Sequence, residues 1–213
     1  MSTTHDHGRD HDHAPISDGD SPVSKHEVLE TALRELLIEK GVITAEQVHA
    51  QIDTMESRNP GLGAKIVARA WSDPGFRARL IAEPRATIES AFGIDMWKVA
   101  ELVVLENTDD LHHVVVCTLC SCYPRMVLGP PPAWYKSTAY RARVVRDPRG
   151  VLEEFGVDLP AATKLRVVDS TADMRFLVIP VRPDGTDGMD EAALAGLVTR
   201  DSMIGTGSAK QPV

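Results

Sequence analysis

Residues 114–122 read Val-Val-Val-Cys-Thr-Leu-Cys-Ser-Cys, and this stretch contains all three cysteines of the 213-residue chain. Its three consecutive valines favour a β-strand, which would deliver the cysteines onto a tight loop with the spacing C-x-x-C-x-C. Two thiols two residues apart cannot share one face of a helix, so the loop must wrap around a ligand. Because thiolates select soft or borderline metal ions, the stretch predicts a metal-binding loop at the end of a strand.

The residues alone leave the metal and its ligand set open. A structural zinc normally has a fourth cysteine or histidine, and an iron–sulfur cluster also needs a fourth ligand. His112 and His113 precede the loop, but neighbouring strand residues point to opposite faces, so we interpret this pair as structural. The short spacing instead brings backbone amides within reach of an ion, and such strong donors favour a trivalent one. Three sulfurs and two amides would leave one octahedral position open, which is typical of a catalytic site.

The composition, with 43% hydrophobic and 25% charged residues, is that of a soluble globular protein. A net charge of -8 argues against a broad nucleic-acid-binding face. No apolar run approaches the ~20 residues that span a bilayer, and residues 1–20 lack the apolar stretch of a secretory signal. An odd cysteine number without an export signal excludes a disulfide framework. We expect a cytoplasmic protein with neither nucleic-acid nor membrane partners.

Sequence patterns divide the chain into four parts. Residues 1–24 form a tail rich in histidine and aspartate that has little to bury and is predicted to be disordered. The alternating histidines could gather a divalent metal, although a solvated tail is the preferred interpretation. A helical arm is expected over 25–93, the metal-binding domain over 94–205, and a flexible tail over 206–213.

Hydrophobic periodicity and helix-end signals place the expected elements. Thr44 and Gln47 form a capping box, and Asp73-Pro74 and Asp147-Pro148 each supply a cap with a first-turn proline. Gly93 closes a helix. Helices are expected over 24–41, 44–58, 62–71, 73–82, 84–92, 137–146, 147–156 and 190–198, and strands over 102–106, 113–116, 165–168 and 175–181. This pattern predicts an α+β domain preceded by helices.

The cysteine loop, residues 117–122, resembles the metal loop of the nitrile hydratase α subunits, and the similarity covers most of residues 26–205. It continues in 68–71, Val127-Leu128-Gly129, Pro131-Pro132, Trp134-Tyr135-Lys136, 140–146, Pro148-Arg149, Glu154-Phe155-Gly156, Met174-Arg175-Phe176 and 200–205. The resemblance implies a layered α/β/β/α catalytic domain that follows an N-terminal helical arm.

The resemblance also implies a ligand set. Cys117, Cys120 and Cys122 would be thiolate ligands, completed by the backbone nitrogens of Ser121 and Cys122. In the family the second cysteine is oxidised to sulfinic acid and the third to sulfenic acid, which are Cys120 and Cys122 here. Thr118 stands where cobalt-type members carry threonine and iron-type members serine. The implied cofactor is therefore one low-spin, non-corrin Co³⁺ per chain, with iron less favoured.

The implied activity is that of a lyase that hydrates a nitrile to the corresponding amide. The ion would polarise the nitrile as a Lewis acid, and the sulfenate oxygen of Cys122, or an activated water, would attack its carbon. Ser121 could orient the nucleophile through its hydroxyl. Asp169 and Asp173 match two acidic positions of the family, whose role would be to fix the orientation of the ligands.

Partner proteins are part of what the resemblance implies. A β-type subunit would supply two arginines to the oxidised sulfurs, and the helical arm would embrace that subunit. A cobalt-insertion activator protein would load the metal. A hypothesis of another class is a non-catalytic metal-binding protein that uses the histidine-rich tail and the cysteine loop.

The chain departs from ordinary nitrile hydratases at Arg125-Met126, where Trp-Pro is usual. A polar Arg125 at the substrate pocket could bind a heterocyclic nitrile such as the nucleoside antibiotic toyocamycin. It would also suit the small anion that a related enzyme family member, the thiocyanate hydrolase γ subunit, acts on. Alternatively, Arg125 points to solvent.

Two groups of side chains around this region are given structural roles. The aromatic residues Trp134, Tyr135 and Tyr140 are expected to pack in the core. The arginines 141, 143 and 146 share a helix with acidic neighbours and are expected to form salt bridges to another subunit.

Overall fold

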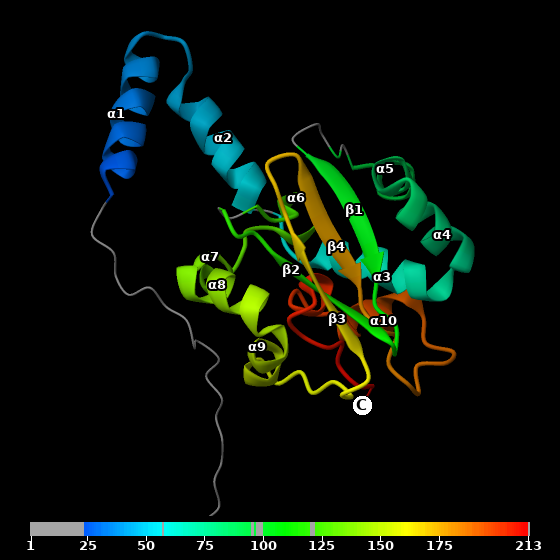
Figure 1. Cartoon of the computed structure of the whole chain (residues 1–213). Helices are drawn as coiled ribbons and strands as arrows, with labels where there is room; N and C mark the ends of the chain where they lie inside the picture. Colours follow the sequence, from blue (N-terminus) through cyan, green and yellow to red (C-terminus); the bar gives the residue numbers. More distant parts are fainter. Residues whose placement is uncertain (1–23, 57, 95, 97–99, 120–121, 213) are drawn as a thin grey trace, which may run out of the picture.

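A computed structural model describes residues 24–56, 58–94, 96, 100–119 and 122–212 of the chain (Figure 1). The predicted tail over 1–24 lies outside this part except for Ser24, and Cys120 and Ser121 also lie outside it. Within the described ranges, no helix has both the length and the hydropathy that crossing a membrane demands.

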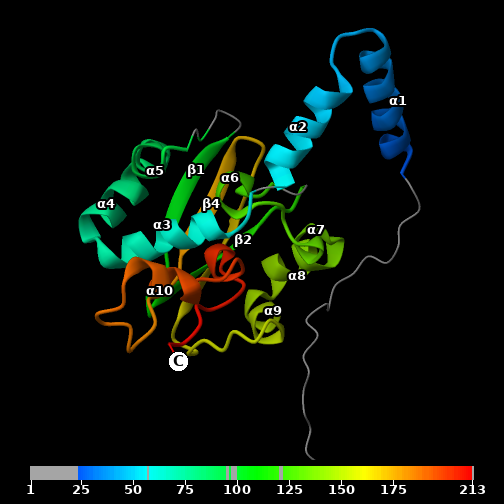
Figure 2. The same cartoon turned by 180° about the vertical axis from the view of Figure 1, so that it is seen from behind.

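A helical hairpin of α1 (Lys25–Glu39) and α2 (Ala45–Glu56) extends away from the body of the molecule (Figures 1 and 2). The predicted capping box begins α2: Thr44 N donates to Gln47 Oε1 at 2.9 Å and Gln47 N donates to Thr44 Oγ1 at 3.2 Å. Helix α1 has no buried residue. This hairpin therefore makes little hydrophobic contact within its own chain.

Three helices then cover one side of the domain: α3 (Gly61–Ser72), α4 (Pro74–Ala82) and α5 (Pro84–Phe92). The Asp73 carboxylate accepts from Phe76 N at 2.9 Å, so the predicted cap of α4 is confirmed. Helix α5 ends at Gly93, whose φ of +64° is left-handed, also as predicted.

Four strands form two parallel pairs, β1 (Glu101–Glu106) with β4 (Met174–Ile179) and β2 (Leu111–Val116) with β3 (Lys164–Asp169). Short connections join β1 to β2 and β3 to β4, so each connection carries the chain from one pair to the other. All residues of β2 after Leu111 are buried, whereas no residue of β3 is fully buried. Strand β2 is therefore internal.

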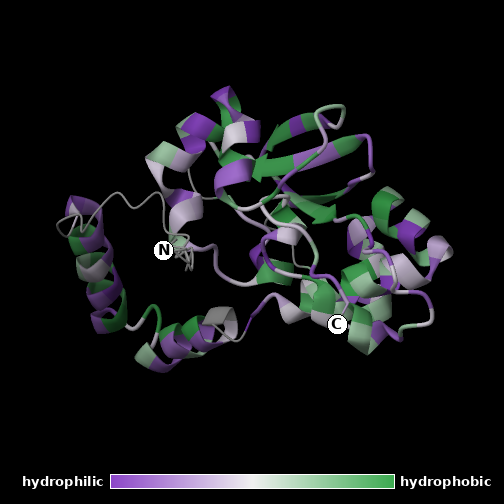
Figure 3. Cartoon of the chain, turned by 90° about the horizontal axis from the view of Figure 1, so that it is seen from below, coloured by the Kyte–Doolittle hydropathy of each residue, from purple (hydrophilic) through white to green (hydrophobic). Residues whose placement is uncertain are grey.

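The remaining helices are α6 (Arg125–Leu128), α7 (Ala133–Lys136), α8 (Thr138–Arg146), α9 (Pro148–Glu154), α10 (Glu191–Leu197) and the 3₁₀ helix η1 (Ser202–Ile204). Helices α4 and α5 lie against β1, and α9 lies against β3 on the opposite side (Figure 1). The layers thus run α/β/β/α, which confirms the predicted α+β architecture. Figure 3 shows long hydrophobic stretches on the strands, whereas hydrophilic and hydrophobic residues alternate along the arm.

Three regions differ from the expectations. Of the arm predicted over 25–93, only α1 and α2 extend from the body, because α3, α4 and α5 bury apolar residues against the domain. The connection over 123–132 contains the single-turn helix α6, which begins after Pro124 because a proline fits the start of a helix. The segment from 206, expected to be a flexible tail, packs on the domain: Thr206 and Ala209 are buried, and Lys210 N donates to the Leu197 carbonyl at 2.8 Å.

Candidate metal centre

The cysteine loop begins where β2 ends. Val116 is paired with Asp169 in the parallel ladder, and Ser170 N donates to the Val116 carbonyl at 2.7 Å. Cys117 follows directly and is fully buried. The end of β3 therefore lies beside the first thiol, although about fifty residues of chain separate them.

Asp169, one of the two predicted acidic residues, holds the next residue of the loop. Its carboxylate accepts from Thr118 N at 2.9 Å and, through its other oxygen, from the Thr118 hydroxyl. On the other side, Arg141 Nη1 donates to the Thr118 carbonyl at 3.2 Å. Thr118 and Arg141 also line a cavity of about 300 Å³ against α8. Asp169 thus orients the backbone directly after Cys117.

The other end of the loop is held from α7. Cys122 is 9% exposed, and the Tyr135 hydroxyl donates to its carbonyl oxygen at 2.9 Å. The rings of Tyr123 and Tyr135 pack edge to face with centroids 5.0 Å apart. Burial raises the pKa of Tyr135 well above its usual value, and the nearby thiols of Cys117 and Cys122 raise it further. The Tyr135 phenol is therefore neutral.

The expected packing role of the aromatic residues is confirmed for Trp134 and Tyr140. Trp134 lies 4.9 Å from Tyr140 and 4.7 Å from Phe155 between ring centroids. The Tyr140 hydroxyl donates to the Val115 carbonyl at 2.9 Å. Tyr135 is also buried in the core, and in addition it forms a hydrogen bond to the loop that the sequence did not predict. No spacing rule links a tyrosine to a cysteine thirteen residues earlier, so only the fold reveals that bond.

The histidine pair before the loop is structural, as predicted. His112 Nε2 lies 2.8 Å from the Gly205 carbonyl and its Nδ1 3.1 Å from Asn107 Nδ2. A carbonyl only accepts, so Nε2 carries the proton, and Nδ1 accepts from the Asn107 amide nitrogen, which makes His112 neutral. Asn107 Oδ1 accepts from the His113 backbone N–H at 2.8 Å and lies 3.1 Å from its Nδ1. Burial lowers the pKa of both histidines.

Two other predicted site residues are not brought into the loop contacts. Asp173 is exposed in the β3–β4 connection, and its carboxylate makes no hydrogen bond to the described residues. Arg125 begins α6, three residues after Cys122, and is exposed. Cys120 and Ser121, predicted as ligands, lie outside the described residues.

Two of the three α8 arginines that were expected to form salt bridges to another subunit contact their own chain, and for Arg146 the expectation stays a prediction. Arg143 forms a two-point ion pair with Glu154 of its own chain, at 2.6 and 2.8 Å. Arg141 binds the loop carbonyl instead. The reason is the sharp turn between α8 and α9, which brings the two helices together.

A comparison with known proteins identifies the family of this chain. The family model described as "Nitrile hydratase, alpha chain" matches residues 24–207. The chain belongs to the nitrile hydratase alpha-chain family.

The nitrile hydratase relatives are similar over nearly their whole length. A nitrile hydratase subunit alpha of Rhodococcus sp. is 51% identical over 85% of this chain and 92% of its own. A cobalt-containing nitrile hydratase subunit alpha of Pseudonocardia thermophila is 49% identical over 84% and 88%.

Solved structures share the fold as well. A recombinant thiocyanate hydrolase with partially modified cobalt centres is 43% identical, with a TM-score of 0.82 over 90% of this chain and 93% of its own. A mutant iron-type nitrile hydratase of Comamonas testosteroni Ni1 is 44% identical, with a TM-score of 0.81 over 90% and 94%. Both cobalt and iron thus occur among its structural neighbours.

The described donors fit a nitrile hydratase metal site. Two buried cysteines, Cys117 and Cys122, stand at the two ends of a short loop. Sulfur donors in a buried pocket suit a soft or borderline ion. The contacts from Asp169, Arg141 and Tyr135 to the loop backbone are the kind of support that orients metal ligands.

Proposed function

We propose that this chain is the metal-binding subunit of a cobalt nitrile hydratase that converts a nitrile and water to an amide. The observation that carries the proposal is the pair of buried thiols of Cys117 and Cys122, with the loop between them braced from β3, α7 and α8. Identity of 49% to a cobalt-containing relative supports cobalt over iron.

The proposed roles follow the loop. Cys117, Cys120 and Cys122 hold the ion together with the backbone nitrogens of Ser121 and Cys122. Cys120 would carry a sulfinic acid and Cys122 a sulfenic acid, formed when an oxidant such as dioxygen or a peroxide adds oxygen to their thiolates. When bound, trivalent cobalt supplies a Lewis acid for the nitrile. Ser121 orients the nucleophile, and Asp169 keeps the loop in position.

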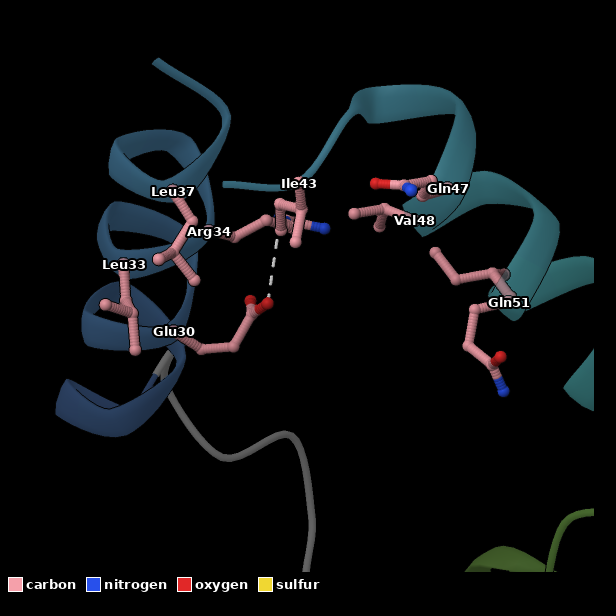
Figure 4. Close-up of a pocket in the computed structure, with 9 residues that line it drawn as sticks. Glu30, Leu33, Arg34, Leu37, Ile43, Gln47, Val48 and Gln51 are labelled. Carbon is pink, nitrogen blue, oxygen red and sulfur yellow. Dashed lines mark ion pairs between the residues drawn. The ribbon is translucent and has the colours of Figure 1, made fainter. Parts of the chain in front are cut away.

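The arm is proposed to bind the β-type partner, which would complete the site with arginines. Val28, Leu29 and Leu33 are 60%, 55% and 57% exposed along α1. A pocket of about 440 Å³ separates α1 from α2, with Leu33 and Leu37 facing Val48 (Figure 4). An apolar helix face that its own chain does not cover is typical of a protein–protein contact.

Production with a β-type partner and cobalt tests the proposal. We expect one cobalt per chain, a sulfur-to-metal charge-transfer band, and an amide from a small aliphatic or heterocyclic nitrile. The peptide 117–122 should carry two added oxygens on Cys120 and one on Cys122. Cys117→Ala should lose the cobalt, whereas Val127→Ala, equally buried but outside the loop, should keep it. Tight cobalt without turnover of any nitrile or thiocyanate would instead favour a non-catalytic metal-binding protein.

A second candidate is a thiocyanate hydrolase γ-type subunit. Arg125 is exposed three residues after Cys122, and a guanidinium there suits a small anionic substrate. The similarity to a thiocyanate hydrolase structure supports this candidate as well. Parallel assays on a nucleoside nitrile and on thiocyanate separate the two, since Arg125→Trp should suppress turnover of the anion more than that of a neutral nitrile.

Three further expectations stay predictions from the sequence. They are the cytoplasmic location, the activator protein that inserts cobalt, and a role of Asp173 in the reaction. Asp173→Asn in the loaded complex tests the last: unchanged turnover would remove Asp173 from the site.

A further inference from the structure

Tyr135 contacts the end of the metal loop at Cys122. Its side chain is fully buried, in a helix of only four residues. The hydroxyl donates to the Cys122 carbonyl at 2.9 Å. A carbonyl held in this way restrains the backbone at Cys122, from whose Cα the side chain with the sulfur projects.

The ring of Tyr135 restrains the same segment a second time. It packs edge to face on Tyr123, the next residue, with centroids 5.0 Å apart and planes at 73°. Tyr123 is itself 3% exposed. Tyr135 therefore restrains the end of the loop twice. Its hydroxyl holds Cys122 by a hydrogen bond, and its ring holds Tyr123 by an aromatic contact.

The beginning of the loop is held by different residues. Cys117 continues β2, whose last residue pairs with Asp169, and the Asp169 carboxylate binds Thr118. Removing the Tyr135 hydroxyl should therefore loosen Cys122 more than Cys117, which keeps the pairing of β2 and the Asp169 contact at Thr118. This asymmetry separates a specific role in positioning from a general contribution to folding.

We propose that Tyr135 is a positioning residue that fixes the sulfur of Cys122 relative to that of Cys117. This inference deepens the proposed function, because Cys122 is the ligand assigned the reactive oxygen. The hydrogen bond itself, however, belongs to the folded chain and is testable without a metal.

The chain provides a matched control in Tyr140. This residue is also fully buried, and its hydroxyl also donates to a backbone carbonyl at 2.9 Å, that of Val115 inside β2. Phenylalanine at either position removes one buried hydroxyl and keeps the ring. The two variants should lose similar thermal stability, but only Tyr135→Phe removes a restraint on the loop.

The test measures alkylation of the full chain produced without cobalt. Iodoacetamide is added in the native state, and peptide mass spectrometry follows the rates at Cys117 and Cys122. Tyr135→Phe should raise the Cys122 rate relative to Cys117 about fivefold, the factor for one net hydrogen bond. Tyr140→Phe should leave that ratio unchanged. An unchanged ratio in Tyr135→Phe, or an equal change in Tyr140→Phe, would overturn the proposal.

A second measurement covers the case in which Tyr135→Phe does not fold. The chain has three tyrosines, so labelling with 3-fluorotyrosine gives three ¹⁹F signals, assigned with Tyr123→Phe and Tyr140→Phe. Alkylation of Cys122 should shift the Tyr135 signal and leave that of Tyr140 in place. A Tyr135 signal that does not move refutes the contact.

The cobalt-loaded complex supplies the link to function. Tyr135→Phe should weaken the charge-transfer band and reduce the oxygen content of Cys122, while Tyr140→Phe retains both. If the wild-type complex binds cobalt and forms no amide, the proposed function fails. The alkylation ratio still decides on Tyr135, so the two failures are distinguishable.

Discussion

A methyl group added at Gly205 should strongly lower the free energy of unfolding of the domain. Its φ is +75°, and it follows η1 directly. A Cβ there would overlap the His113 carbonyl oxygen, with the carbonyl carbon at 2.8 Å and Val114 Cα at 3.2 Å. The crowded atoms are backbone of β2, the strand that leads into Cys117. No side-chain rotation can relieve the overlap.

The expected cost of Gly205→Ala has three parts. A left-handed conformation costs a residue with a Cβ about 1–2 kcal/mol. Movement of Gly205 away from β2 breaks the 2.8 Å hydrogen bond from His112 to its carbonyl, which costs about 1–3 kcal/mol for a buried group. The displaced β2 then loses packing. We expect a total above about 4 kcal/mol, a large share of the stability of a typical domain.

Gly93→Ala is the matched control. Gly93 also has a left-handed φ, +64°, but a Cβ there meets nothing within 4 Å. Only the conformational part applies, so its cost should be about 1–2 kcal/mol. Urea unfolding followed by circular dichroism measures both variants. If Gly205→Ala unfolds within about 1 kcal/mol of Gly93→Ala, the reasoning about the contact with β2 is refuted.

Three further predictions concern the arm, the histidines and the surface. Leu33→Glu should leave the chain folded and weaken the complex with the β-type partner by about 1.5–3 kcal/mol, seen as a roughly 10- to 150-fold higher Kd. Because burial lowers the pKa of His112 below its unfolded value, the folded state binds fewer protons. The stability that His112 contributes is complete above its unfolded pKa, about 6.5, and is lost as the pH falls below that value through the lower folded pKa. Arg143 lowers the pKa of Glu154, so Glu154→Gln should cost below about 1 kcal/mol.

Each of these has its control. Glu30, on the same helix as Leu33 and already charged, can be changed to Gln, and an equal loss of partner affinity there would contradict the apolar contact. His112→Gln should flatten the decrease in stability on acidification, and an unchanged slope would contradict the assignment to His112. The effect of Glu154→Gln should vanish in high salt and below the folded pKa of Glu154, because an exposed ion pair is screened; a salt-independent effect would be inconsistent with an ion pair.

Local signals in the sequence predicted much of the helical part. Thr44 with Gln47 and Asp73 with Pro74 act through residues three positions apart or fewer, so their meaning does not depend on the rest of the fold. The cysteine spacing was equally informative, because it limits the chemistry that the loop can perform. The assignment of Asp169 to the vicinity of the loop came from family resemblance, and its two bonds to Thr118 place it there.

Long-range contacts could not be predicted. The pairing of β1 with β4 and of β2 with β3 depends on packing across most of the domain. Tyr135 was expected only to fill space, since the sequence does not say which carbonyl a buried hydroxyl meets. The sequence does not show that Arg143 pairs with Glu154 of its own chain. The turn that brings the two residues together depends on how α8 and α9 pack.

The parallel pairing of β2 with β3 has a consequence for the order of folding. A ribosome releases Cys117 before Arg141 and well before Asp169, and β3 must cross back beside β2 before the carboxylate can reach Thr118. Contacts between residues far apart in sequence form slowly. The contacts of Asp169 and Arg141 with Thr118 therefore form only after the second half of the domain has docked on β2.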